Sequence, residues 1–141
     1  MGYKPYSITA SLTLDRTRHL DAMLVLNAAA GLTVTLPASS GSGDKYIFTV
    51  GTTVTSNNDI IKVANSTDIM AGNAVQAADG GSTANMWETG ATDDTITLNG
   101  TTTGGVKGDR ITLEDVASGV WQVVIIGSAT GTEATPFSAT V

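Results

Sequence analysis

The sequence predicts an all-β protein, and three observations lead to this fold class. Glycine makes up 16 of the 141 residues and threonine is also abundant; these residues favour turns and strands, respectively. Short apolar runs are separated by turn residues about every ten positions. No apolar pattern with a helical period continues for more than about two turns. We therefore predict a β-sandwich or jelly-roll-like domain of about seven to nine short strands. A single-stranded β-helix is the alternative, but the chain lacks the strict short repeat of that architecture.

The clearest local prediction is a β-hairpin within residues 108–127. Residues 110–116 alternate apolar and polar side chains, as in a strand with one buried face. The Ala-Ser-Gly link at residues 117–119 allows a tight reversal, because glycine can adopt positive φ. The second run, residues 120–126, leaves only Gln122 polar. We therefore expect both faces of this strand to be covered, by a second sheet or by a neighbouring subunit.

The chain is predicted to have two parts. Residues 1–11 form an extended N-terminal arm, since Pro5 restricts Lys4 to extended conformations. Residues 12–141 form one β-sandwich domain, because a chain of this length suits a single core.

Other strands are predicted from shorter patterns. Residues 32–36 and 46–50 both alternate, and we expect them to form a second hairpin-like unit. Residues 71–94 lack a clear pattern, so we expect a long loop with one short strand at residues 85–88. The remaining predicted strands are residues 12–14, 22–26, 60–63, 68–70 and 95–98.

Composition excludes several classes of protein. The net charge is −6 and there are only seven Lys and Arg residues, whereas nucleic-acid surfaces need clustered cations. The chain has no Cys, and therefore neither disulfides nor a thiolate metal site. Its longest apolar run is too short to span a bilayer. We expect neither a nucleic-acid partner nor a membrane.

No pattern in the sequence indicates catalytic chemistry. His19 is the only histidine, and no serine lies on a nucleophile elbow. Asp15, His19 and Asp21 are better explained as solvated charges than as metal ligands. Asp93 and Asp109 would have to meet across a groove to cleave a glycan, and nothing in the sequence indicates that they do. We predict no catalytic residues, no metal, no cofactor and no enzymatic activity.

The candidate contact residues lie mainly near the N-terminus. This region combines aromatic, proline and cationic side chains that could dock onto a partner; these are Tyr3, Lys4, Pro5, Tyr6, Arg16 and Arg18. A frayed, solvated terminus is the alternative interpretation. Trp87, in the weakly patterned loop, and Phe137, in the C-terminal tail, are candidates for a subunit interface or a loop contact. Phe137 could also anchor the tail on its own domain.

Three segments resemble small bacteriophage virion proteins, and the resemblance extends over residues 12–141. They are residues 32–50 (LTVTLPASSGSGDKYIFTV), 95–100 (TITLNG) and 108–123 (GDRITLEDVASGVWQV). The TLP-turn strand, the strand led by a Gly-Asp pair and the Trp-containing return strand are similar to those of head decoration (cement) proteins and of tail-fibre head modules. The resemblance carries no catalytic residues.

The function that this resemblance implies is decoration of the capsid. Such a protein is a β-rich homotrimer on the outer surface of the capsid in the virion. It binds the major capsid protein, bridges neighbouring subunits and stabilises the shell against internal DNA pressure. The alternative is a trimeric receptor-binding or tail-fibre head module that contacts a host glycan through residues 71–94. The chain has no heptads or shaft repeats to join such a head to a fibre.

Overall fold

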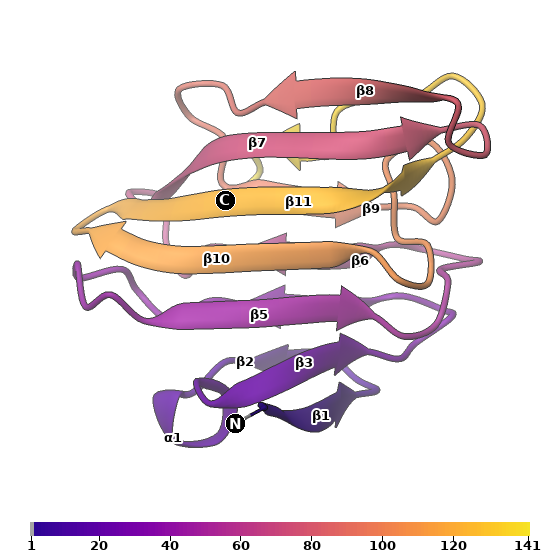
Figure 1. The fold of residues 1–141 in the computed structure, drawn as a ribbon. Helices are drawn as coiled ribbons and strands as arrows, with labels where there is room; N and C mark the ends of the chain where they lie inside the picture. The colour runs from indigo at the N-terminus through magenta and orange to yellow at the C-terminus, as the bar shows by residue number, and fades with distance from the viewer. Residues whose placement is uncertain (1) are drawn as a thin grey trace.

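The protein is described by a computed structural model covering residues 2–141, which contain twelve β-strands and one short helix (Figure 1). In chain order the elements are β1 (Lys4–Ile8), β2 (Leu12–Thr13), α1 (Arg16–His19), β3 (Ala22–Leu26), β4 (Leu32–Thr35), β5 (Lys45–Val50), β6 (Asp59–Lys62), β7 (Ile69–Ala78), β8 (Thr83–Glu88), β9 (Thr95–Leu98), β10 (Arg110–Ala117), β11 (Val120–Ala129) and β12 (Phe137–Ser138). The predicted all-β class is confirmed, with more strands than the seven to nine expected. No helix in this range is long and apolar enough to cross a membrane.

The strands form two mixed sheets. The seven-stranded sheet has the order β1-β3-β5-β10-β11-β7-β8, and the five-stranded sheet has the order β12-β9-β6-β4-β2. In Figure 1 the five-stranded sheet lies behind the seven-stranded one. Apolar side chains from both sheets, such as Phe48 and Ile61, belong to one hydrophobic core.

The first six strands alternate between the two sheets. In the seven-stranded sheet β1, β3 and β5 run parallel, and in the other sheet β2, β4 and β6 run parallel. This is the winding of a parallel β-helix, the alternative architecture considered from the sequence. The number of residues in one turn of the winding varies. This is shown by the strand register, in which Lys4 pairs with Ala22 whereas Met23 pairs with Ile47. Unequal turns explain why no sequence repeat accompanies the winding.

The predicted hairpin at residues 108–127 is confirmed. Strands β10 and β11 pair antiparallel from Arg110↔Ile126 to Ala117↔Val120. Gly119 lies in the turn with φ of 83°, a conformation that residues with a Cβ adopt only at a cost.

The prediction of a second hairpin-like unit is wrong. Residues 32–35 form β4 in the five-stranded sheet, whereas residues 45–50 form β5 in the other sheet. The connecting loop of small residues crosses between the sheets. Alternation alone identifies a buried face but does not identify the partner strand.

The prediction of a long loop at residues 71–94 is wrong except for its short strand at residues 85–88, which lies within β8. Strand β7 pairs in parallel with β11 over its whole length and antiparallel with β8. Its sequence, IMAGNAVQAA, consists largely of small side chains with low strand preference. Strand structure is imposed here by pairing on both sides.

The N-terminal segment is extended, as predicted, but it is not a free arm. Strand β1 is an edge strand that pairs in parallel with β3, and Ile8 is buried in the core. Pro5 is tolerated because an edge strand can leave one side without ladder hydrogen bonds. Deleting residues 1–11 would therefore remove core contacts as well as exposed side chains.

Candidate interaction surfaces

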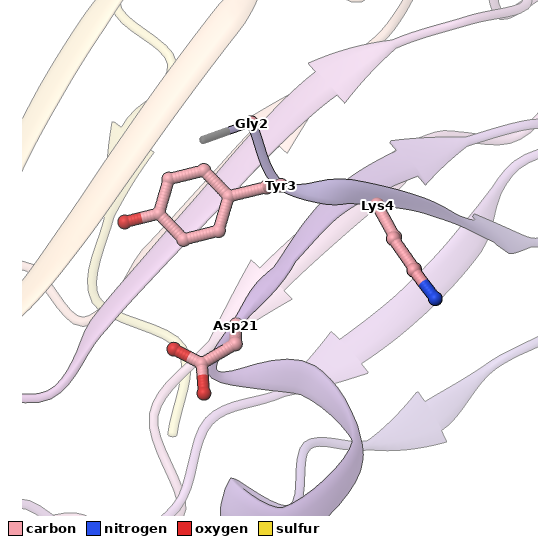
Figure 2. A pocket seen from close by; sticks show the side chains of 4 residues that line it. All are labelled: Gly2, Tyr3, Lys4 and Asp21. Atoms are coloured by element: carbon pink, nitrogen blue, oxygen red, sulfur yellow. The ribbon is translucent and has the colours of Figure 1, made fainter.

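The N-terminal candidates come from β1 and α1, which lie against each other at one end of the molecule. The Tyr6 ring on β1 meets the buried His19 ring of α1 edge to face, with ring centroids 4.8 Å apart. Tyr3 is 50% exposed, and Lys4 and Pro5 are exposed as well. Tyr3 and Lys4 line a surface hollow with Gly2 and Asp21 (Figure 2). We call this surface, formed by Tyr3, Lys4 and Pro5, the N-terminal face.

The cations of α1 are largely compensated by acidic neighbours. Asp15 caps the helix by accepting a hydrogen bond from the Thr17 amide. The Arg16 Nε lies 2.7 Å from Asp44 Oδ2, and the Arg18 Nε lies 3.7 Å from Asp15 Oδ2. Within residues 2–141, Lys4 forms no ion pair. Lys4 is therefore the only one of the three N-terminal cations without an ion pair in this range.

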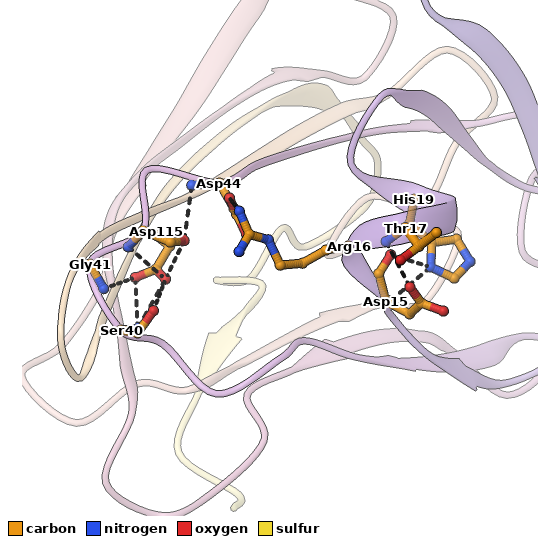
Figure 3. Close-up of polar contacts among 9 residues, drawn as sticks. Asp15, Arg16, Thr17, His19, Ser40, Gly41, Asp44 and Asp115 are labelled. Carbon is orange, nitrogen blue, oxygen red and sulfur yellow. Dashed lines mark hydrogen bonds and ion pairs between the residues drawn. The ribbon is translucent and has the colours of Figure 1, made fainter.

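The Arg16–Asp44 pair connects α1 to a loop that Asp115 holds in place (Figure 3). The buried Asp115 carboxylate, on β10, accepts hydrogen bonds from the amides of Ser40, Gly41 and Ser42. The Ser42 hydroxyl donates a further bond of 2.9 Å. Burial alone would raise the pKa of Asp115, but these hydrogen bonds outweigh it and lower the pKa below its ordinary value.

Substituting Asp115 with asparagine is expected to lower the free energy of unfolding by about 2 kcal/mol at pH 6, since charge-assisted hydrogen bonds are lost. Because the folded-state pKa is lowered, the wild-type advantage exists above pH 3.8 and is lost as the pH falls through the folded pKa. Urea unfolding at several pH values measures this difference. Equal stability of the two proteins at pH 6 would contradict the role of Asp115 in holding the loop.

Other buried carboxylates also organise loops. Asp94 accepts hydrogen bonds from the Thr140 and Val141 amides and so holds the C-terminal tail. Burial alone would raise its pKa, but hydrogen bonds to Thr140, Thr95 and Val141 lower it. Asp109 accepts bonds from the Gly105, Val106 and Ser128 amides. Burial raises its pKa despite these bonds. These contacts give both carboxylates a structural role, since each orders the backbone of a neighbouring loop or tail.

Asp59 differs from the other buried carboxylates. Its side chain faces the core from β6 and is fully buried, and neither oxygen accepts a hydrogen bond from the described part of the chain. Burial raises its pKa from 3.8 to about 6, an effect that the nearby Leu32 amide offsets only in part. No signal in the sequence distinguishes Asp59 from a loop aspartate.

Trp87 and Phe137 are not exposed contact residues. Phe137 is 4% exposed, belongs to the core and pairs with Ile96 through β12 and β9. This corrects its assignment to a subunit interface: Phe137 anchors the tail on its own domain. Trp87 is half-buried against the core, and its Nε1 donates a hydrogen bond of 3.1 Å to Gln76.

A second surface lies where the sequence analysis expected residues 120–126 to be covered on both faces, but the chain itself leaves the outer face exposed. On the outer face of the seven-stranded sheet, strands β11, β7 and β8 expose four apolar side chains, namely Val75 (40%), Met86 (77%), Val124 (46%) and Ile126 (60%). We call these four residues the outer patch. The signal in the sequence was the almost fully apolar run at residues 120–126. One face of that run is buried, whereas the other is left uncovered by the chain itself.

Within residues 2–141, no three His, Cys, Asp or Glu side chains gather in an arrangement suited to a metal ion. The sequence matches no known protein-family model, and a comparison with curated proteins finds no significant relative. The two surfaces and the motifs of the sequence are therefore the features that bear on function.

Proposed function

We propose that this chain is a bacteriophage virion protein of β-sandwich type that decorates the outer surface of the head and stabilises contacts between major capsid subunits. One observation carries the proposal. The N-terminal face and the outer patch lie at opposite ends of one seven-stranded sheet, on β1 and on β11-β7-β8. A cement protein that bridges subunits needs at least two separate contact surfaces on a rigid body, and this arrangement supplies them.

The two surfaces differ in chemistry and therefore suit different partner groups. The N-terminal face combines an exposed aromatic ring with an unpaired cation, a combination suited to a partner with acidic and apolar groups. The outer patch is apolar and suits a partner surface of the same character. The Arg16–Asp44 ion pair joins α1, which lies beside β1, to the loop that Asp115 holds.

The glycan-binding alternative has less support. It relied on Trp87 as a ring on which a sugar could stack, and the indole packs against the core with its N–H bonded to Gln76. We therefore propose no glycan site.

Substituting Lys4 with glutamate together with Tyr3→Ser is expected to reduce binding to capsids by about tenfold or more, since aromatic and charged anchors dominate protein interfaces. The measurement is co-sedimentation of the purified protein with a panel of expanded phage heads that lack decoration protein. Lys62, on β6 of the five-stranded sheet and in no ion pair within residues 2–141, provides a matched control through Lys62→Glu.

Point variants are a sharper test than a deletion of residues 1–11, because the deletion would also remove Ile8, which is buried in the core. Wild-type protein that remains in the supernatant with every head would refute the decoration function. Wild-type binding that the Lys4 and Tyr3 substitutions leave unchanged would refute only the role of the N-terminal face.

A further inference from the structure

The outer patch is a continuous block in the strand register. One row of partners across the sheet runs Arg110↔Ile126↔Val75↔Met86, and the adjacent row on the same face runs Thr112↔Val124↔Asn73↔Glu88. The four residues of the outer patch therefore occupy neighbouring positions of this block of eight residues, with Ile126, Val75 and Met86 in one row and Val124 in the next. Exposed apolar side chains grouped in this way mark an interaction surface rather than scattered exposure.

Two charges lie at opposite corners of this block. Arg110, on β10, begins the first row, and Glu88, on β8, ends the second. Both are exposed, and neither forms an ion pair within residues 2–141. The neighbouring Lys45 and Glu114 differ in this respect, since they pair with each other at 3.3 Å. The block therefore has an apolar centre and two unsatisfied charges of opposite sign.

We propose that the outer patch binds the outer patch of a second copy of this chain through a two-fold axis. An axis lying parallel to the face, along the diagonal from Val124 to Val75, places each of these valines against its own counterpart. The same operation exchanges the opposite corners of the block. Arg110 of one copy then lies over Glu88 of the second copy, and the contact is repeated by symmetry. A two-fold interface requires this kind of self-complementary surface.

This pairing goes beyond the proposed function, because it takes place in solution without any capsid. In such a dimer the outer patches are covered, and the N-terminal faces of the two copies, at the far edges of the two sheets, are the separate surfaces that contact the capsid. It also differs from the trimer that the resemblance implies, since a two-fold contact closes on two copies. The mass of the protein in solution distinguishes the two arrangements.

Charge reversal provides the test. Sedimentation equilibrium over a range of concentrations is expected to give the mass of a dimer, or of an even number of copies, for the wild type. Arg110→Glu and Glu88→Arg should each weaken association by about tenfold or more, because each places like charges together twice. The double variant R110E/E88R should restore association. Rescue is specific to a direct contact between the two positions.

A charged residue placed within the outer patch completes the experiment. Ile126→Lys should abolish association. Val116 is 48% exposed and lies outside the outer patch, so Val116→Lys should leave association unchanged. Circular dichroism and thermal unfolding of each variant verify that it is folded. A wild-type monomer or trimer would overturn the proposal, as would single charge reversals that leave the mass unchanged or a double variant that fails to associate. Binding to phage heads is measured separately, so failure here leaves the decoration function standing.

Discussion

Replacing Trp121 with alanine is expected to lower the free energy of unfolding by about 3 to 5 kcal/mol, the range for a large aromatic side chain removed from a core. Trp121 is 1% exposed and packs against the buried Tyr46 ring, with centroids 5.9 Å apart. It lies on β11 beside the turn of the hairpin, opposite Asp115 of β10, and joins this end of the hairpin to the core. Chemical denaturation monitored by circular dichroism measures the effect.

A phenylalanine at the same position distinguishes packing from hydrogen bonding. The Trp121 Nε1 is buried and has no hydrogen-bond partner among residues 2–141, so its removal costs no bond and relieves an unpaired donor. Trp121→Phe should therefore lose much less stability than Trp121→Ala, by about 1.5 kcal/mol or less. A near-neutral alanine variant would place the indole outside the core. A phenylalanine variant as unstable as the alanine variant would indicate a polar contact of the indole.

The wild-type protein is expected to lose about 3 kcal/mol of stability through Asp59 as the pH rises from 4 to 8. The cause is the full burial of an unpaired carboxyl group, which raises its pKa from 3.8 to about 6. A pKa shift of one unit corresponds to about 1.4 kcal/mol. The shift of the Asp59 pKa from 3.8 to about 6 therefore corresponds to about 3 kcal/mol. Below pH 3.8 the group is protonated in both the folded and the unfolded chain and costs nothing. Between pH 3.8 and about 6 the unfolded chain ionises Asp59 while the folded chain still holds the proton, so stability falls. Above about pH 6 the group is ionised in both states and the loss is complete.

Comparison with Asp59→Asn isolates this contribution. The buried asparagine has a cost of its own, but that cost does not depend on pH. The stability of the variant relative to the wild type should therefore increase by about 3 kcal/mol between pH 4 and pH 8. Urea unfolding across this range measures it. Parallel pH profiles for the two proteins would show that Asp59 has a partner when ionised.

The Asp115→Asn variant serves as a control for the same chemical change. Its effect should have the opposite dependence on pH, because hydrogen bonds lower the pKa of Asp115 whereas burial raises that of Asp59. Together the two groups predict that stability is highest in mildly acidic solution. The lowered pKa of Asp94 acts in the same direction as that of Asp115.

The candidate surfaces were predictable only in part. Tyr3, Lys4 and Pro5 could be selected from the sequence because aromatic and cationic residues are rare elsewhere in the chain. Their neighbours could not be judged in the same way. Arg16 is compensated by Asp44, which lies 28 residues away, and Phe137 is buried by a pairing of β12 with β9. Such contacts depend on segments that meet only in the folded chain.

The sequence by itself determined the all-β class, the hairpin of β10 and β11 and the approximate position of most short strands. These features are local, because alternation and turn residues act over neighbouring positions. The tertiary structure alone decided which sheet each strand joins, as β4 and β5 demonstrate, and it made a strand of the small residues in β7. It also decided that Ile126 faces outward while Asp59 faces the core. Pairing and burial are long-range properties, and the same local pattern is compatible with several partners until the whole chain has folded.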